Sequence, residues 1–141
     1  MNVKNVICTI LGMAGAAVSE AFGGWSSALT TLIIFMGLDY ITGIVVAGVF
    51  KASKKSSGGG LESKAGWKGL MKKGVTLVIV LASARLDMLI GTNYIKDAVI
   101  IAFCANELIS IIENAGLMGV PIPSTITKAI EVLKEKGDKD A

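Results

Sequence analysis

Residues 28–50 read ALTTLIIFMGLDYITGIVVAGVF, a run of 23 residues in which Asp39 is the one charged side chain. A helix rises about 1.5 Å per residue, so a run of this length matches a hydrocarbon core about 30 Å thick. The stretch therefore predicts a transmembrane helix.

The composition of the whole chain agrees with a membrane class. Apolar residues make up 52% of the 141 residues, charged residues make up 18%, and the mean hydropathy is +0.66. A soluble domain carries roughly 25% charged residues, so this chain has too little polar surface to cover itself in water. Its 17 glycines and low aromatic content of 6% suit close contact between helices in lipid. We expect an all-α membrane protein.

Three further apolar stretches are long enough to be helices, at residues 6–22, 75–94 and 97–119. Glycine-rich turns separate them from their neighbours, and Pro121 and Pro123 end the last, because proline cannot continue a helix. The sequence predicts three or four transmembrane helices. The open alternative is whether residues 6–22 cross the membrane.

The chain then divides into a helical membrane domain, 1–123, and a C-terminal part, 124–141. In the C-terminal part Ile126, Ile130 and Leu133 recur at helical spacing, which predicts a short amphipathic helix followed by a charged tail.

The connection at residues 51–73 is basic. It holds seven lysines against one acid, Glu62, and the glycine-rich run 56–60 inside it predicts a flexible joint. A basic stretch can bind nucleic acid, but short lysine-rich loops between spans typically face the cytoplasm. We therefore predict no nucleic-acid partner. The loop and the C-terminus are predicted to be cytoplasmic, in a multi-pass protein of a bacterial plasma membrane.

Enzymatic chemistry has no candidate residues in this sequence. Histidine is absent, and no phosphate-binding loop, metal-ligand spacing or nucleophile–base pair is present. Cys8 and Cys104 lie in apolar segments without a CxxC spacing, so we interpret them as small hydrophobic residues. The prediction is a protein without catalytic, cofactor-binding or metal-binding residues.

Polar side chains inside the predicted spans are the candidate functional residues, because charges in lipid must face a partner or water. Glu107, Ser110 and Glu113 or Asn114 fall on one helical face, and Arg85 has candidate counter-ions in Asp39, Glu107 and Glu113. They either tie the helices of one subunit together or line a water-filled lesion formed by several subunits. The full set is Asp39, Arg85, Asp87, Asn106, Glu107, Ser110, Glu113 and Asn114.

Small residues at four-residue spacing are candidates for close helix packing, and hence for a homo-oligomer in membrane lipid. They include Gly12, Gly15, Gly43 and Ala47.

The sequence resembles the holin family of phage-lysis and toxin-secretion proteins from Gram-positive phages and clostridia. The resemblance runs from about Asp39 to Leu133. It is carried by Asp39-Tyr40-Ile41-Thr42-Gly43, Lys72-Lys73, the run ELISIIEN at 107–114, and Gly119-Val120-Pro121-Ile122-Pro123.

The resemblance implies a small protein that oligomerises in the host plasma membrane and forms pores or lesions. These release an endolysin, which leads to host cell lysis, or a large toxin; either is a functional partner. It implies no catalytic residues. Two alternatives remain open: an antiholin regulator, and an ion channel or transporter subunit. Channel filters or inverted repeats would favour a channel or transporter, and we find none.

Overall fold

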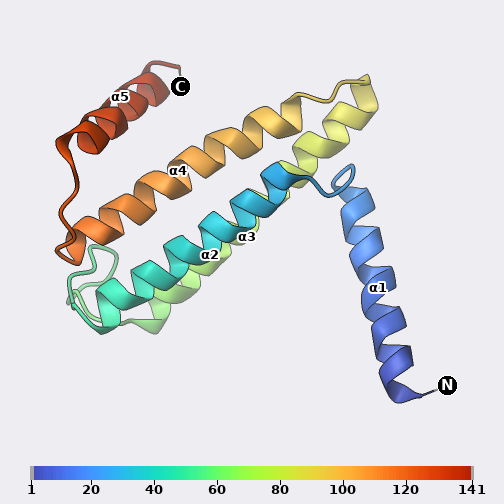
Figure 1. The fold of residues 1–141 in the computed structure, drawn as a ribbon, viewed down its shortest axis with the longest axis horizontal. Helices are drawn as coiled ribbons and strands as arrows, with labels where there is room; N and C mark the ends of the chain where they lie inside the picture. Colours follow the sequence, from blue (N-terminus) through green and yellow to red (C-terminus); the bar gives the residue numbers. More distant parts are fainter. Residues whose placement is uncertain (1, 141) are drawn as a thin grey trace. The chain divides into compact units, whose positions relative to one another are not determined.

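The computed structural model describes residues 2–140, and the side chains of residues 133, 134 and 136–140 lie outside this description. Most of the predicted charged tail therefore lies outside the described side chains. Within the described range the chain forms helices and no strand (Figure 1), which confirms the all-α prediction. The helices are α1 (Val3–Ala21), α2 (Ser27–Gly48), α3 (Ser63–Ile90), α4 (Ile95–Leu117) and α5 (Ser124–Asp140).

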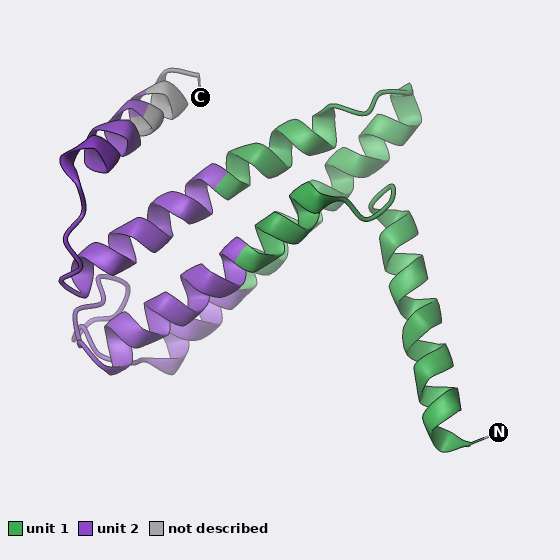
Figure 2. Cartoon of the chain, viewed as in Figure 1, with its two compact units in different colours: residues 1–34, 71–104 green, residues 35–70, 105–141 purple. Residues whose placement is uncertain are grey.

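Two compact units make up the structure (Figure 2). Unit 1 comprises residues 1–34 and 71–104, and unit 2 comprises residues 35–70 and 105–141. Each unit thus contains parts of α2, α3 and α4.

Unit 1 has an apolar core. Leu29 and Leu32 from α2, Val80 and Ala84 from α3, and Ile100 from α4 are all buried. Turns with glycine at positive φ connect the helices. Gly23 has a φ of 74°, and the amide of Gly24 donates to the carbonyl of Ser19 at 2.8 Å, which closes the end of α1.

Unit 2 has a mixed core. Its buried apolar residues are Met36, Val46 and Ala47, and its buried polar residues are Asp39, Glu107 and Asn114. Burial of polar groups is costly unless they are hydrogen-bonded, so these three residues direct attention to the contacts between α2 and α4.

The connection between α2 and α3 is shorter than predicted. α3 begins at Ser63, where the amide of Gly66 donates to the carbonyl of Glu62 at 3.1 Å, so residues 63–73 are helical. Lysine is a good helix former, and its abundance indicated exposure rather than irregular structure. Residues 56–60, predicted to be a flexible joint, lie in turns, and the Ser53 amide donates to the Gly59 carbonyl at 2.9 Å.

Among the described residues, two helices, α1 and α2, are long and apolar enough to cross a membrane. The prediction of three or four such helices was therefore wrong by this measure of length and composition. α3 and α4 are comparably long, with 28 and 23 residues, but charged side chains interrupt their apolar stretches. These are Arg85 and Asp87 in α3, and Glu107 and Glu113 in α4.

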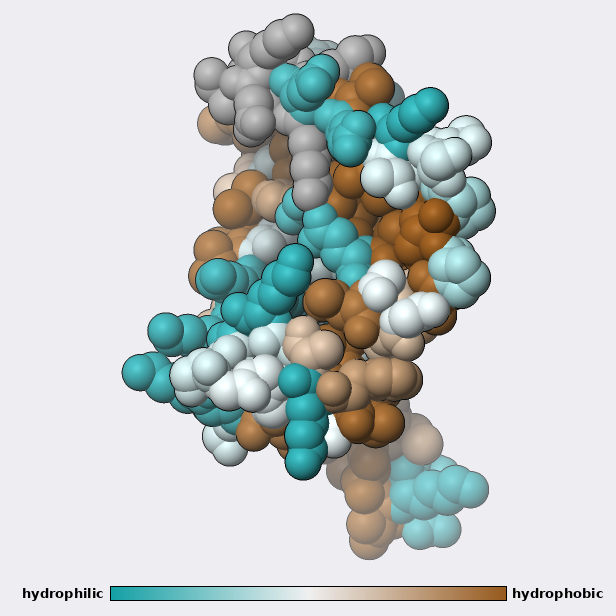
Figure 3. Space-filling model, turned by 90° about the vertical axis from the view of Figure 1, so that its left-hand side faces the viewer, coloured by the Kyte–Doolittle hydropathy of each residue, from teal (hydrophilic) through white to brown (hydrophobic). Residues whose placement is uncertain are grey.

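The surface is unusually apolar for a chain in water. α1 has no buried residue, and it exposes 71% of Val3, 60% of Ile10, 66% of Leu11 and 69% of Met13. Figure 3 shows hydrophobic residues over wide areas of one face, between hydrophilic ones. Exposed apolar area of this extent marks contact with lipid or with another protein.

Candidate functional site

A buried polar network joins α2 to α4 in unit 2. The Ser110 hydroxyl donates to Oδ1 of Asp39 at 2.6 Å. The Asn114 amide nitrogen donates to the same oxygen at 3.1 Å, to the Asp39 carbonyl at 3.2 Å and to Oγ1 of Thr42 at 2.9 Å. The network therefore satisfies a carboxylate whose residue is only 6% exposed.

The helical periodicity of both helices places these groups together. On α4, Glu107, Ser110 and Asn114 follow one another at i, i+3 and i+7, and all three are turned at least partly away from solvent. On α2, Thr42 follows Asp39 by three residues, and its hydroxyl also bonds back to the Asp39 carbonyl at 3.1 Å. Each helix presents one polar stripe, and the two stripes meet.

Small residues continue the α2 side of this contact. A Cβ atom on Gly43 would lie 3.9 Å from the amide nitrogen of Asn114, and Ala47, one turn later, is 7% exposed. Gly43 thus leaves room for Asn114 to reach α2. Gly12 and Gly15 differ, because a Cβ atom on either would meet nothing within 4 Å.

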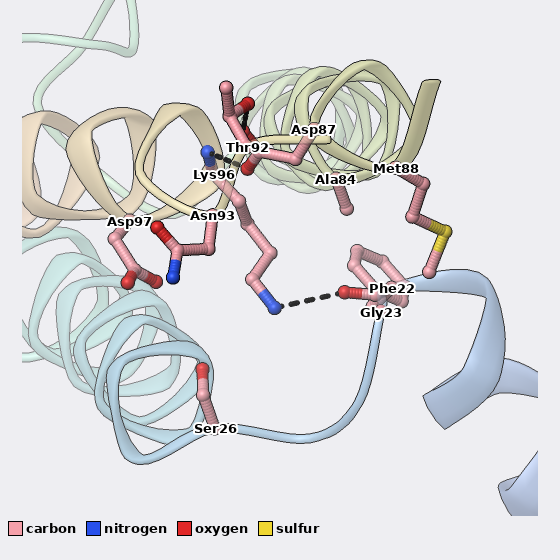
Figure 4. Close-up of a pocket in the computed structure, with 10 residues that line it drawn as sticks. All are labelled: Phe22, Gly23, Ser26, Ala84, Asp87, Met88, Thr92, Asn93, Lys96 and Asp97. Carbon is pink, nitrogen blue, oxygen red and sulfur yellow. Dashed lines mark hydrogen bonds between the residues drawn. The ribbon is translucent and has the colours of Figure 1, made fainter. Parts of the chain in front are cut away.

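Asp87 organises the turn between α3 and α4 in unit 1 (Figure 4). Its carboxylate accepts hydrogen bonds from the Thr92 hydroxyl at 2.5 Å, the Ile95 amide at 3.1 Å and the Lys96 amide at 2.8 Å. The first amides of a helix lack partners within the helix, and an acceptor near them stabilises its start. Asp87 therefore caps α4 from the last turn of α3.

A cleft of about 300 Å³ lies beside this turn, and Figure 4 shows the ten residues that line it. Nζ of Lys96 donates to the carbonyl of Phe22 at 3.0 Å, which ties the end of α1 to the start of α4. A Cβ atom on Gly23 would lie 3.2 Å from Cε of Met88, so the α1–α2 turn packs tightly against α3.

The remaining predicted site residues are dispersed. Glu107 is buried, whereas Asn106 and Glu113 are exposed on α4. Arg85 is exposed, and Nη1 contacts Sδ of Met88 at 3.1 Å. Its proposed counter-ions belong to unit 2 and Arg85 to unit 1, so their pairing stays a prediction.

Sequence reasoning missed three participants in these contacts: Thr42, Thr92 and Lys96. It also missed Tyr40, whose hydroxyl donates to the Gly66 carbonyl at 3.2 Å. The spacing of Asp39 and Thr42 by three residues could have identified the first. No group of His, Cys, Asp or Glu side chains that could hold a metal ion occurs within the described part of the chain.

The helical fold, the two apolar helices and the exposed apolar surface define the class as a small helical membrane protein. The sequence pattern of the bacteriophage holin family matches residues 16–135. The chain belongs to this family.

Relatives extend over nearly the whole chain. An uncharacterized protein of Clostridium perfringens strain 13 is 34% identical over 137 residues, covering 94% of this chain and 96% of that protein. An uncharacterized protein of Listeria innocua is 37% identical over 139 residues, covering 93% of each. A probable holin of Bacillus phage phi105 is 29% identical over 112 residues, covering 79% of this chain and 77% of that protein. No solved structure matches the chain significantly.

Proposed function

We propose that this protein oligomerises in a bacterial plasma membrane and opens lesions through which an endolysin, or a large secreted toxin, leaves the cytoplasm. Membership of the holin family and the similarity to a probable phage holin support this role. The structural observation that carries it is α1, an apolar helix of 19 residues without one buried residue. Such a helix needs lipid or another subunit against its sides.

The proposed topology is multi-pass, with α1 and α2 as crossings, in a membrane domain of residues 1–123. Asp87 lies in the last turn of α3, three residues before its end. Asp39 and Asn114 satisfy each other across α2 and α4. Both arrangements reduce the cost of placing these segments in lipid.

The orientation then follows from charge. With α1 and α2 as crossings, the N-terminus and the lysine-rich residues 51–73 share one side of the membrane. We propose that residues 124–141 lie on that side too. The positive-inside rule assigns that side to the cytoplasm. The turn at residues 22–26 lies on the opposite side.

Two roles are proposed for the polar residues of the spans. The network of Asp39, Ser110 and Asn114 holds α2 and α4 of one subunit together. Arg85 and Asn106 are exposed, so they can face water in a lesion lined by several subunits. Small residues at Gly12 and Gly15 have open space around them and support packing of α1 between subunits.

Inducible expression in bacteria tests the proposal. Membrane potential, followed with a voltage-sensitive dye, should collapse at a defined time after induction, and growth should stop at that moment. An antiholin would reach the same membrane, leave the potential intact and delay killing by a co-expressed holin. An unchanged potential with the protein present in the membrane fraction would contradict the proposal.

A further inference from the structure

Tyr40 of α2 contacts the start of α3 within unit 2. The Tyr40 hydroxyl donates to the Gly66 carbonyl at 3.2 Å. A Cβ atom on Gly66 would lie 3.4 Å from that hydroxyl, and one on Gly69 would lie 3.8 Å from Cε2 of the ring. The two glycines therefore form the face of α3 that packs against the tyrosine of α2.

Several side chains in these turns are exposed, including Leu70, which follows Gly66 by one helical turn. Trp67 is 64% exposed, Leu70 is 47% exposed, and Lys64 and Lys68 are also exposed. Trp67 follows Lys64 by three residues, and Lys68 follows Lys64 by four. Both side chains are therefore neighbours of Lys64 on the helix. Leu61, just before the helix, is 67% exposed. Exposed lysines and large apolar side chains thus occur together in these first turns of α3 and just before them.

The preceding connection adds three exposed lysines, Lys51, Lys54 and Lys55. Gly59 has a φ of 76°, and its backbone lies close to Lys51. A Cβ atom on Gly59 would clash with the Lys51 carbonyl. The single acid of the segment, Glu62, accepts hydrogen bonds from the amide and hydroxyl of Ser57 at 3.3 and 3.4 Å. We use the name basic surface for these exposed side chains of the connection and the first turns of α3: Lys51, Lys54, Lys55, Lys64 and Lys68, with Leu61, Trp67 and Leu70.

We infer that the basic surface binds the headgroups of anionic phospholipids. The surface begins at Lys51, three residues after the end of α2, one of the two helices apolar enough to cross a membrane. Lysines next to a membrane span lie within reach of lipid phosphates, which attract them electrostatically. Tryptophan and leucine among them can insert at the level of the headgroups. The inference rests on the chain residing in a membrane, and it does not depend on lesion formation.

The apolar side chains favour a lipid surface over nucleic acid. A phosphate backbone could also attract five lysines, but it offers no apolar phase for Leu61 and Leu70, which expose large parts of their side chains. One tryptophan on the surface could stack on a base. The combination of two exposed leucines with lysines at the end of an apolar helix matches the interface of a bilayer better.

The test uses Trp67 as a reporter in the full-length protein. Replacing Trp25 by phenylalanine leaves Trp67 as the single tryptophan. The variant is reconstituted into vesicles of mixed phosphatidylcholine and phosphatidylglycerol, in which one lipid or the other carries bromine near the headgroup. Bromine quenches tryptophan fluorescence on contact, so the ratio of the two quenching efficiencies reports which lipid surrounds Trp67.

We expect brominated phosphatidylglycerol to quench Trp67 at least about twofold more than brominated phosphatidylcholine, and salt to reduce the preference. Replacing Lys64 and Lys68 by glutamine should lower the ratio toward one, and replacing both by arginine should preserve it. The matched control replaces Lys4 and Lys128 by glutamine, which removes the same charge outside the basic surface and should leave the ratio unchanged. Circular dichroism checks that each variant retains its helices.

Several results would overturn the inference. Equal quenching by both lipids, with no response to salt, would show that Trp67 does not select anionic lipid. An absence of quenching by either lipid would show that the surface does not reach the bilayer. A labelled oligonucleotide that binds the reconstituted protein through Lys64 and Lys68, without any lipid preference, would assign the surface to nucleic acid instead. Each outcome is independent of whether cells expressing the protein die.

Discussion

Replacing Asn114 by alanine removes the amide that joins α4 to α2 in unit 2. In the structure this nitrogen donates to Oδ1 and the carbonyl of Asp39 and to Oγ1 of Thr42, at distances between 2.9 and 3.2 Å. Asn114 is 6% exposed, so water cannot readily replace these bonds. The Ser110 hydroxyl still reaches Asp39 in the variant.

The size of the effect follows from two contributions. Hydrogen bonds between helices of membrane proteins contribute about 0.6 kcal/mol each on average. The Asn114 amide has two N–H protons to share among its three acceptors, so it contributes about 1 kcal/mol. The buried Asp39 carboxylate loses a donor, which costs about 1 kcal/mol more. We therefore expect the free energy of unfolding to fall by about 2 kcal/mol, or about 30-fold in the folding equilibrium.

The measurement is reversible unfolding of the purified protein in mild detergent by added dodecyl sulfate, followed by circular dichroism. Asn106→Ala is the matched control, because it makes the same substitution on the same helix at an exposed position. It should change the free energy of unfolding by less than about 0.5 kcal/mol. Equal effects of the two substitutions, or no effect of Asn114→Ala, would refute the argument that the buried network stabilises the pairing of α2 and α4.

Three further predictions concern the topology and the two contact regions. A cysteine at the exposed Gly58, in a chain whose native cysteines are replaced, should resist an impermeant thiol reagent in intact cells; rapid labelling would reverse the proposed orientation. Asp87→Ala should lower the free energy of unfolding by about 1 to 2 kcal/mol, because α4 loses its cap, while Asp97→Ala at an exposed position should change it little in the same assay. Gly43→Leu should place side-chain atoms where Asn114 approaches, so it should destabilise the protein in dodecyl sulfate, and unchanged unfolding would argue against that contact.

The sequence was sufficient for the class and the helices, because apolar runs of span length have few other stable conformations. It was not sufficient for the beginning of α3. The lysines in residues 63–73 indicate exposure to water, but lysine is also compatible with a helix. The number of helices judged able to span also differed, because charges in α3 and α4 offset their apolar residues.

For the candidate site, residue spacing along one helix was informative, but the packing between helices was not predictable from it. The spacing of Glu107, Ser110 and Glu113 or Asn114 predicted one polar face on α4. Ser110 and Asn114 of this face contact Asp39 of α2, whereas Glu113 is exposed. The identity of the partners depended on how the helices rotate about their axes, which local periodicity does not determine. The sequence predicted Asp87 to be a charge within a span, but in the structure it caps α4. The sequence could not show this role, because it depends on where α3 ends.

The proposed role of this holin-family protein is to open the membrane to a cytoplasmic endolysin. The most direct measurement expresses it together with an endolysin that lacks an export signal, and records culture density and endolysin activity in the medium. Abrupt lysis at a fixed time, with activity released only when both proteins are present, is the predicted result. A culture that keeps its density and retains the endolysin inside the cells, while the protein accumulates in the membrane, would contradict the claim.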